Sequence, residues 1–223
     1  MYVMAFNGSP RKKGWNTVTL IQNALKGAES AGAEIELVQL YDLNFSGCLS
    51  CFSCKKLDRK EDGVCSVADD LTPVLDRIRT ADAMIIGTPL YWGSESAATR
   101  AFLERLLFPC SNYSKDAKSL FPKRIKTAMI YTMGIKEDML ESSGFQQKIA
   151  FTRDMIENYF GPCELLLCND TLQYSDYDKY ESEMFDKEAK LKRHTEVFPI
   201  DCQRAFELGV RMASGAVPER NGI

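Results

Sequence analysis

Small and polar residues crowd the turn that follows the first apolar run of the chain, residues 2–6. The turn begins Asn-Gly-Ser-Pro-Arg at positions 7–11, and Asn16 and Thr17 close it where a segment of helical period begins. Hydroxyl, amide and guanidinium groups bind anions, and a helix start adds free N–H groups and a positive dipole end. A solvated polar turn would have the same composition, but the pattern favours a phosphate site. Its expected donors are Ser9, Arg11, Asn16 and Thr17.

Two familiar nucleotide-binding loops are missing from this turn. It contains no Gly-x-x-x-x-Gly-Lys-Ser/Thr, which excludes a P-loop NTPase, and no Gly-x-Gly-x-x-Gly, which excludes the dinucleotide fingerprint. The chain has one histidine, His194. A Ser-His-Asp triad or a histidine-rich zinc centre would therefore depend on that single residue.

Two further segments follow apolar runs and could contact a flat ligand. The first, residues 87–94, combines a stiffening proline with two aromatic side chains, and the second, residues 131–134, is a short strand-to-loop turn. Aromatic surface and loop N–H groups suit a flavin ring, whereas core aromatics and a plain turn are the alternatives. The candidate residues are Pro89, Leu90, Tyr91, Trp92, Gly93, Thr132 and Gly134.

Four of the eight cysteines gather in one polar segment, as Cys48-x-x-Cys51-x-x-Cys54 followed by Cys65. Soft thiolates at this spacing suit a [4Fe-4S] cluster, and four thiolates can also hold zinc. Reduced structural thiols are the third interpretation and the one we favour. Arg105, which follows an apolar run, is expected to form an ion pair and not a catalytic contact.

Along the chain, short β-rich runs alternate with longer segments of helical period. This order predicts an α/β fold, with a five-stranded parallel sheet and helices on both faces. The expected strands are 2–6, 35–40, 83–87, 127–131 and 163–168, and the expected helices are 17–31, 72–80, 96–107, 149–160 and 201–213. We expect residues 1–168 to form one domain and residues 169–223 an extension packed on it or on a partner subunit.

Charge and hydropathy exclude several classes of protein. Lys and Arg number 28 against 31 Asp and Glu, a formal net charge of −3, which argues against nucleic-acid binding. The apolar runs are too short to span a bilayer, and the N-terminal residues show no secretory signal pattern. We therefore expect a cytoplasmic protein with neither membrane nor nucleic-acid partners.

The loop residues together resemble a known family. Residues 7–11 with Asn16 and Thr17 resemble the FMN phosphate loop of the flavodoxin-like NAD(P)H-dependent FMN reductases, which include iron-sulfur flavoproteins and multimeric quinone reductases. Residues 87–94 resemble the segment of that family that lies against the flavin ring. The usual Gly-Asn-Thr ending of the phosphate loop is replaced here by Trp15-Asn16-Thr17, with Gly14 one place earlier.

The resemblance implies a doubly wound flavodoxin-like sheet, FMN as cofactor and NAD(P)H as co-substrate. The implied reaction passes a hydride to the flavin and then electrons to a small-molecule acceptor, such as a quinone, an azo or nitro compound, a free flavin or a metal. No catalytic acid or base is expected, and a homodimer or homotetramer is implied. The alternatives are an electron carrier with a [4Fe-4S] cluster at the four clustered cysteines, and a flavin-free phosphate or nucleotide binder.

Overall fold

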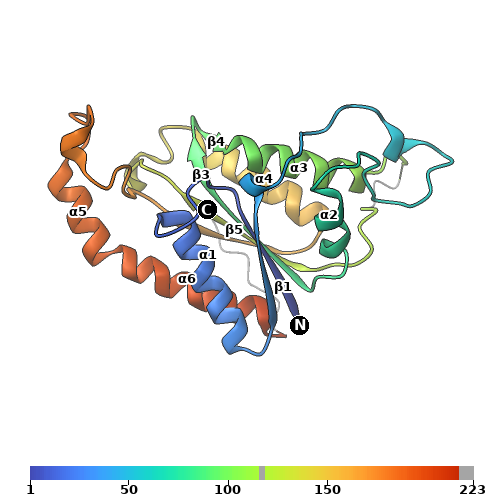
Figure 1. Ribbon diagram of the computed structural model, residues 1–223, viewed down its shortest axis with the longest axis horizontal. Coiled ribbons are helices and arrows are strands. Elements are labelled where there is room, and N and C mark those ends of the chain that lie inside the picture. The colour runs from blue at the N-terminus through green and yellow to red at the C-terminus, as the bar shows by residue number, and fades with distance from the viewer. Residues whose placement is uncertain (116–118, 216–223) are drawn as a thin grey trace.

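A computed structural model describes residues 1–115 and 119–215 of the chain (Figure 1). Strands and helices alternate along most of it. The strands are β1 (Tyr2–Asn7), β2 (Glu34–Gln39), β3 (Ala83–Tyr91), β4 (Ser94–Glu95), β5 (Lys126–Thr132) and β6 (Cys163–Cys168). The helices are α1 (Asn16–Ser30), α2 (Thr72–Ile78), α3 (Ala97–Cys110), α4 (Phe145–Tyr159), α5 (Lys187–Glu196) and α6 (Phe198–Ala213).

The sheet has the order β2-β1-β3-β5-β6, and these five strands are parallel. Counted among the parallel strands alone, this is the order 2-1-3-4-5, which defines the flavodoxin-like form of the doubly wound fold. The predicted fold class is therefore confirmed. The short β4 adds to it by pairing antiparallel with the end of β3.

Helices cover both faces of the sheet, with α1 and α6 on one and α2, α3 and α4 on the other (Figure 1). Successive side chains of a strand point to opposite faces. In β1, Val3 and Ala5 accordingly join the core under α1 and α6, whereas Met4 and Phe6 join the core under α2 and α3. Because both of its faces are buried, β1 reads as a continuous apolar run and not as an alternating one.

The expected C-terminal helix is present as α6, which packs along α1 within the same chain. Two glycines allow the close approach. A Cβ added at Gly209 would overlap the carbonyl oxygen of Ala24, and one added at Gly27 would overlap that of Phe206. The last residues of the predicted extension, 216–223, lie outside the described part of the chain.

One predicted boundary is wrong in a way that affects the site. The third strand was expected to end at position 87, but β3 continues to Tyr91 and turns back at Trp92 and Gly93 into β4. Pro89 suggests a strand end because it cannot donate a ladder hydrogen bond. The strand continues past it because β5 pairs alongside, with Pro89 opposite Thr132.

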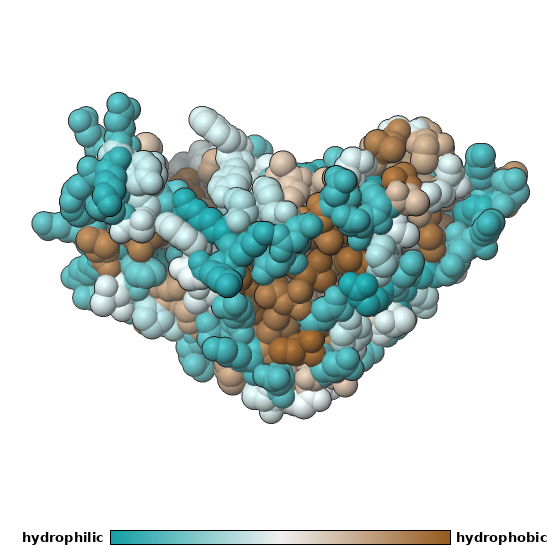
Figure 2. All heavy atoms as spheres, viewed as in Figure 1, coloured by the Kyte–Doolittle hydropathy of each residue, from teal (hydrophilic) through white to brown (hydrophobic). Residues whose placement is uncertain are grey.

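Strand β2 forms one edge of the sheet, and its Ile35 and Leu37 are only partly buried. Figure 2, which has the same view as Figure 1, shows apolar residues at the surface in the middle of the visible face, with hydrophilic residues on either side. Within the described residues, no helix combines the length and the apolar character needed to cross a membrane.

The contact between α1 and α6 makes a prediction whose sign is diagnostic. Helix propensity alone would make Gly209→Ala stabilising by about 1 kcal/mol. Overlap with the backbone of Ala24 should instead destabilise the chain by about 2 kcal/mol. Urea unfolding would measure the change, with Gln203→Ala on the exposed side of α6 as the control. A stabilised Gly209→Ala variant would contradict the close packing.

Candidate functional site

The segments that follow β1, β3, β5 and β6 meet at the carboxyl edge of the sheet. Strand register brings them together, because Asn7 lies opposite Gly87, and Thr132 lies opposite both Pro89 and Cys168. In open parallel sheets, ligands bind at this edge, near the point where the strand order reverses. Here that point lies between β1 and β3.

A buried hydroxyl network joins the first two of these segments. The Ser96 hydroxyl, at the N-cap of α3, donates to the Gly8 carbonyl at 2.5 Å, and the Ser96 N–H donates to Thr88 Oγ1 at 3.2 Å. Thr99 Oγ1 lies 3.1 Å from Thr88 Oγ1. A Cβ at position 8 would overlap the Thr99 hydroxyl, so the loop after β1 needs Gly8 to lie this close to α3.

The four segments line one cleft, which we call the edge cleft. All of the residues predicted to hold a phosphate or border a flavin line it, except Trp92 and Gly93. Trp92 is fully exposed, at a φ of +52° at the tip of the β3–β4 turn. Gly93, at a φ of +76°, packs against Phe145 instead. The predicted residues that share the cleft are Ser9, Arg11, Asn16, Thr17, Pro89, Leu90, Tyr91, Thr132 and Gly134.

One end of the edge cleft is rich in hydrogen-bond donors. Helix α1 begins there with no side-chain cap and no acidic residue in its first turn, so its first N–H groups are left for an anion. The guanidinium of Arg11 lies 3.7 Å over the ring of Trp15, which fixes a cation beside the helix start. The hydroxyls of Thr17 and Thr132 lie 2.7 Å apart. This donor set suits a phosphate ester.

The fourth segment that lines the edge cleft, residues 171–173, was not predicted from the sequence. Their carbonyls already occupy two of the predicted phosphate donors, since Asn16 Nδ2 donates to Leu172 at 2.9 Å and Arg11 Nη1 donates to Gln173 at 3.0 Å. Because this segment crosses the loop after β1, the cleft encloses only about 70 Å³. The signal that could have found it is topological, because residues 171–173 follow the carboxyl end of β6.

A buried carboxylate, Glu95, connects the strand after the β3–β4 turn to β5. Glu95 of β4 accepts a hydrogen bond from Tyr131 at 2.6 Å and lies 3.5 Å from the guanidinium of Arg100. Burial alone would raise the pKa of Glu95, but the Tyr131 hydroxyl and other donors outweigh it and lower that pKa. Burial, together with the charge of Glu95, raises the pKa of Tyr131 well above its ordinary value. The pair is thus held as carboxylate and neutral phenol.

The four clustered cysteines are not arranged as a metal site. Within residues 1–115 and 119–215, no group of three or more Cys, His, Asp or Glu side chains is placed to hold a metal ion. Cys54 is buried, Cys51 is exposed, and Cys48 and Cys65 are intermediate. As arranged, these thiols do not fit a cluster or a zinc ion. By contrast, Cys163 and Cys168 are buried at the ends of β6, as expected of core residues.

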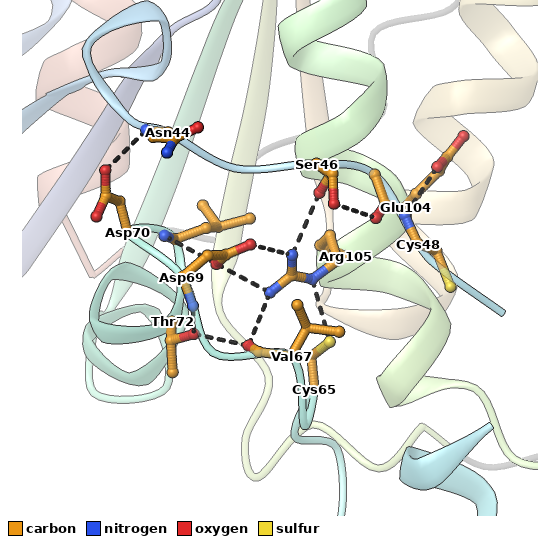
Figure 3. Close-up of polar contacts among 12 residues, drawn as sticks. Asn44, Ser46, Cys48, Cys65, Val67, Asp69, Asp70, Thr72, Glu104 and Arg105 are labelled. Atoms are coloured by element: carbon orange, nitrogen blue, oxygen red, sulfur yellow. Dashed lines mark hydrogen bonds and ion pairs between the residues drawn. The ribbon is translucent and has the colours of Figure 1, made fainter. Parts of the chain in front are cut away.

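Arg105 of α3 organises the cysteine-bearing segment, and its predicted ion pair is confirmed (Figure 3). Its side chain is fully buried and reaches Asp69 at 2.6 Å. It also donates to the carbonyls of Ser46 at 3.2 Å and Val67 at 3.1 Å, and to the sulfur of Cys65 at 3.1 Å. One guanidinium therefore joins both ends of the segment to α3.

The middle of the same segment is attached to α3 by a second cation. Lys55, next to Cys54, donates to the carbonyls of Phe108 at 2.5 Å and Ser111 at 2.6 Å, at the C-terminal end of the helix. Unpaired carbonyls at a helix end favour a cation there. In Figure 1, the cyan segment that carries these cysteines extends to one end of the molecule, away from α5 at the other.

The order of the parallel strands and the cleft at their carboxyl edge define a flavodoxin-like protein. Residues 1–142 match the family described as NADPH-dependent FMN reductase, which covers well over half of the 223 residues. The chain therefore belongs to that family of oxidoreductases.

The chain is also similar to curated proteins named iron-sulfur flavoproteins. One from Methanocaldococcus jannaschii is 35% identical over 105 residues, which is 47% of this chain and 51% of that protein. One from Archaeoglobus fulgidus is 34% identical over 105 residues, which is 47% of this chain and 48% of that protein. The chain thus spans about half the length of these relatives.

Solved structures share the fold at low sequence identity. An NAD(P)H:quinone oxidoreductase from Methanothermobacter marburgensis has a TM-score of 0.70 at 18% identity, covering 94% of this chain and 98% of that one. An FMN-dependent NADH-azoreductase from Bacillus anthracis, solved in complex with FMN, has a TM-score of 0.68 at 11% identity, covering 96% and 100%.

The Arg105 network predicts a large and pH-dependent loss of stability. Arg105→Met removes the cation that pairs with the partly buried Asp69 and one hydrogen bond to each of the Ser46 and Val67 carbonyls, so the free energy of unfolding should fall by about 3 kcal/mol. Burial alone would raise the pKa of Asp69, but Arg105 together with backbone hydrogen bonds from Leu71 and Thr72 outweighs it and lowers that pKa. The stabilisation is therefore present above the unfolded pKa and is lost as pH falls through the folded one.

Denaturant unfolding of the wild type and Arg105→Met should show this difference at neutral pH and a smaller one below about pH 4. Arg77→Met is the matched control, because Arg77 is 44% exposed and pairs with Glu36 at the surface. Its effect should stay within about 1 kcal/mol. Equal losses in the two variants would contradict the organising role of Arg105.

Proposed function

We propose that the chain binds FMN in the edge cleft and catalyses electron transfer from NAD(P)H to a small-molecule acceptor. The observation that carries this proposal is the position of the uncapped start of α1 and Arg11. These donors lie in one cleft with Tyr91 and the Gly134 loop, at the carboxyl edge of a flavodoxin-like sheet. Membership of the NADPH-dependent FMN reductase family supports it.

The residues present would divide the work of holding the cofactor. The hydroxyls of Ser9 and Thr17, the Asn16 amide and the Arg11 guanidinium would bind the phosphate. Asn16 and Arg11 would then exchange their present hydrogen bonds to the carbonyls of residues 172 and 173 for bonds to phosphate oxygens. Flavin, when bound, supplies the hydride and electron-transfer chemistry itself.

The segments at the other end of the cleft would border the flavin ring. Pro89 to Tyr91 would lie along it, with Thr132 and Gly134 on the β5 side, whereas the turn at Trp92 and Gly93 lies outside the cleft. The buried Glu95–Tyr131 pair would keep that turn in place. Two of the solved proteins that share the fold are an NAD(P)H:quinone oxidoreductase and an NADH-azoreductase. We propose an acceptor of this broad class, and a homodimer or homotetramer as the functional form.

A phosphate-specific loss of affinity would test the site. Arg11→Met should weaken FMN binding roughly tenfold, because a charge-assisted hydrogen bond to phosphate is lost. Binding of riboflavin, which lacks the phosphate, should change little. Fluorescence titration measures both, with Lys13→Met as the control, since Lys13 is exposed on the same loop outside the cleft. Equal weakening of FMN and riboflavin would reject a phosphate role for Arg11.

The reaction can be tested by absorption spectroscopy on anaerobically purified protein. NADH or NADPH should bleach the flavin bands of the FMN-loaded chain, and adding an acceptor should restore them. A chain that binds no FMN after saturation would be the flavin-free phosphate binder considered above. A chain whose flavin neither nucleotide bleaches would not be the proposed reductase.

The names of the curated relatives favour a second candidate, an iron-sulfur electron carrier. The arrangement of the four thiols does not favour it, because among the described residues no three ligand side chains are placed to hold a metal ion. We therefore expect substoichiometric iron and acid-labile sulfide in protein purified without oxygen. Four iron and four sulfide per chain, the content of one such cluster, would favour the carrier instead.

A further inference from the structure

One buried lysine of the C-terminal extension contacts two walls of the edge cleft. Lys190 lies in α5, at one end of the molecule in Figure 1, and is only 4% exposed. Its ammonium donates to the carbonyls of Gly134 at 3.0 Å and Thr171 at 3.4 Å. Both of these residues line the edge cleft, the first after β5 and the second after β6. Lys190 does not line the cleft, so it would act on a ligand there only through these walls.

The ammonium of Lys190 has three acceptors, which match its three N–H groups. The third acceptor is the carboxylate of Asp170, at 2.5 Å. Because a lysine ammonium carries three donors and no acceptor, all of its hydrogen-bonding capacity is used within the protein. The carboxylate of Asp170 also compensates its charge. A cation that is saturated and paired in this way holds the backbone in place and does not bind a ligand.

The two walls meet at a sharp bend in the chain. Beyond the strand ends, the Thr171 N–H donates to the Met133 carbonyl and the Asp170 N–H donates to the Ile135 carbonyl, both at 2.9 Å. Asp170 has a φ of +53°, which is uncommon for a residue other than glycine. Such a conformation persists only where the surrounding contacts maintain it. Lys190 supplies two of these contacts, to the Asp170 side chain and to the next carbonyl.

Through these walls, Lys190 affects both ends of the edge cleft. Thr171 leads directly into residues 172 and 173, whose carbonyls accept hydrogen bonds from two of the predicted phosphate donors. Gly134 lies at the end where the flavin ring would lie, with the side-chain amide of Gln173 against its Cα. The spacing between these segments therefore depends on the one ammonium group that binds both.

We propose that Lys190 is a positioning residue for the flavin. It sets the spacing between the Gly134 loop and residues 171–173, and thereby the orientation of the ring between them. The inference rests on the proposed function, because it requires FMN in the edge cleft. It gives the C-terminal extension, which lies beyond the matched residues 1–142, a part in cofactor binding. Walls that are already fixed need less ordering when the ligand binds.

The test removes the cation together with its carboxylate partner. Loss of Lys190 alone would leave the largely buried Asp170 as an unpaired charge, so the variant is Lys190→Met/Asp170→Asn. The Kd for riboflavin should rise roughly tenfold, because the walls must be ordered on binding. The Kd for FMN should rise by no more than this factor, since the phosphate donors are retained. Fluorescence titration measures both and distinguishes this result from the FMN-specific loss expected of Arg11→Met.

A spectroscopic measurement separates positioning from a general loss of stability. At saturating FMN, the visible circular dichroism of the bound flavin should change in the double variant, because the walls around the ring shift. Bleaching of that flavin by NAD(P)H should slow severalfold. Arg105→Met is the matched control, because it removes a buried cation that does not line the edge cleft. Lys192→Met, exposed on the same helix as Lys190, is the surface control. Both controls should keep the wild-type flavin spectrum.

A milder variant guards against misfolding of the first. Lys190→Gln keeps two N–H donors at the end of its side chain, so it should shift the riboflavin Kd and the flavin spectrum in the same direction but by less. Wild-type values in the folded double variant would overturn the proposal, as would wild-type values in Lys190→Gln if the double variant does not fold. The same spectral change in Arg105→Met, or a loss of affinity confined to FMN, would also overturn it.

The two proposals fail in different ways. If the wild-type chain binds neither FMN nor riboflavin, or if NAD(P)H does not bleach its flavin, the proposed function is wrong. If the wild type binds FMN and is bleached, and the Lys190 variants match it in affinity and spectrum, the function stands and Lys190 does not position the flavin.

Discussion

Ser96 links three parts of the carboxyl edge through buried hydrogen bonds. Its hydroxyl accepts from the Thr99 N–H, which caps α3, and donates to the Gly8 carbonyl, and its own N–H donates to Thr88 of β3. A buried hydroxyl without these partners would be strongly unfavourable, so the three groups constrain one another. The path of the loop after β1 follows from this contact. The direction in which α1 presents its first N–H groups follows from that loop.

Two buried cations fix irregular segments toward opposite ends of the molecule by similar hydrogen bonds. Arg105 and Lys190 each bind backbone carbonyls together with one carboxylate. In both cases a long irregular segment, poor in backbone pairing of its own, is fixed by a side chain from a helix. The sheet supplies the frame, and these cations determine where the segments outside the frame lie.

The fold and most of the edge cleft could be predicted because they depend on local patterns. Apolar runs mark the central strands, and glycine, hydroxyl and amide residues mark the loop after β1. Residues 171–173 could not be found this way, since they contribute backbone carbonyls, which carry no signal in side-chain identity. Trp92 was expected to border a flavin because of its aromatic type and the resemblance of residues 87–94 to a family segment; it lies outside the edge cleft, at a φ of +52° in the β3–β4 turn. Whether the four cysteines form a metal site depends on the path of the chain between them. Arg105, which is distant in sequence, fixes part of that path through Ser46, Cys65 and Asp69, and cysteine spacing does not reveal this.

The match to the family ends at residue 142, whereas Leu172 and Gln173, whose carbonyls bind Asn16 and Arg11, lie well after it. The loop after β1 is thus held in part by backbone groups from outside the matched residues. Because every residue type carries a backbone carbonyl, positions 172 and 173 can change in identity while both of these hydrogen bonds persist.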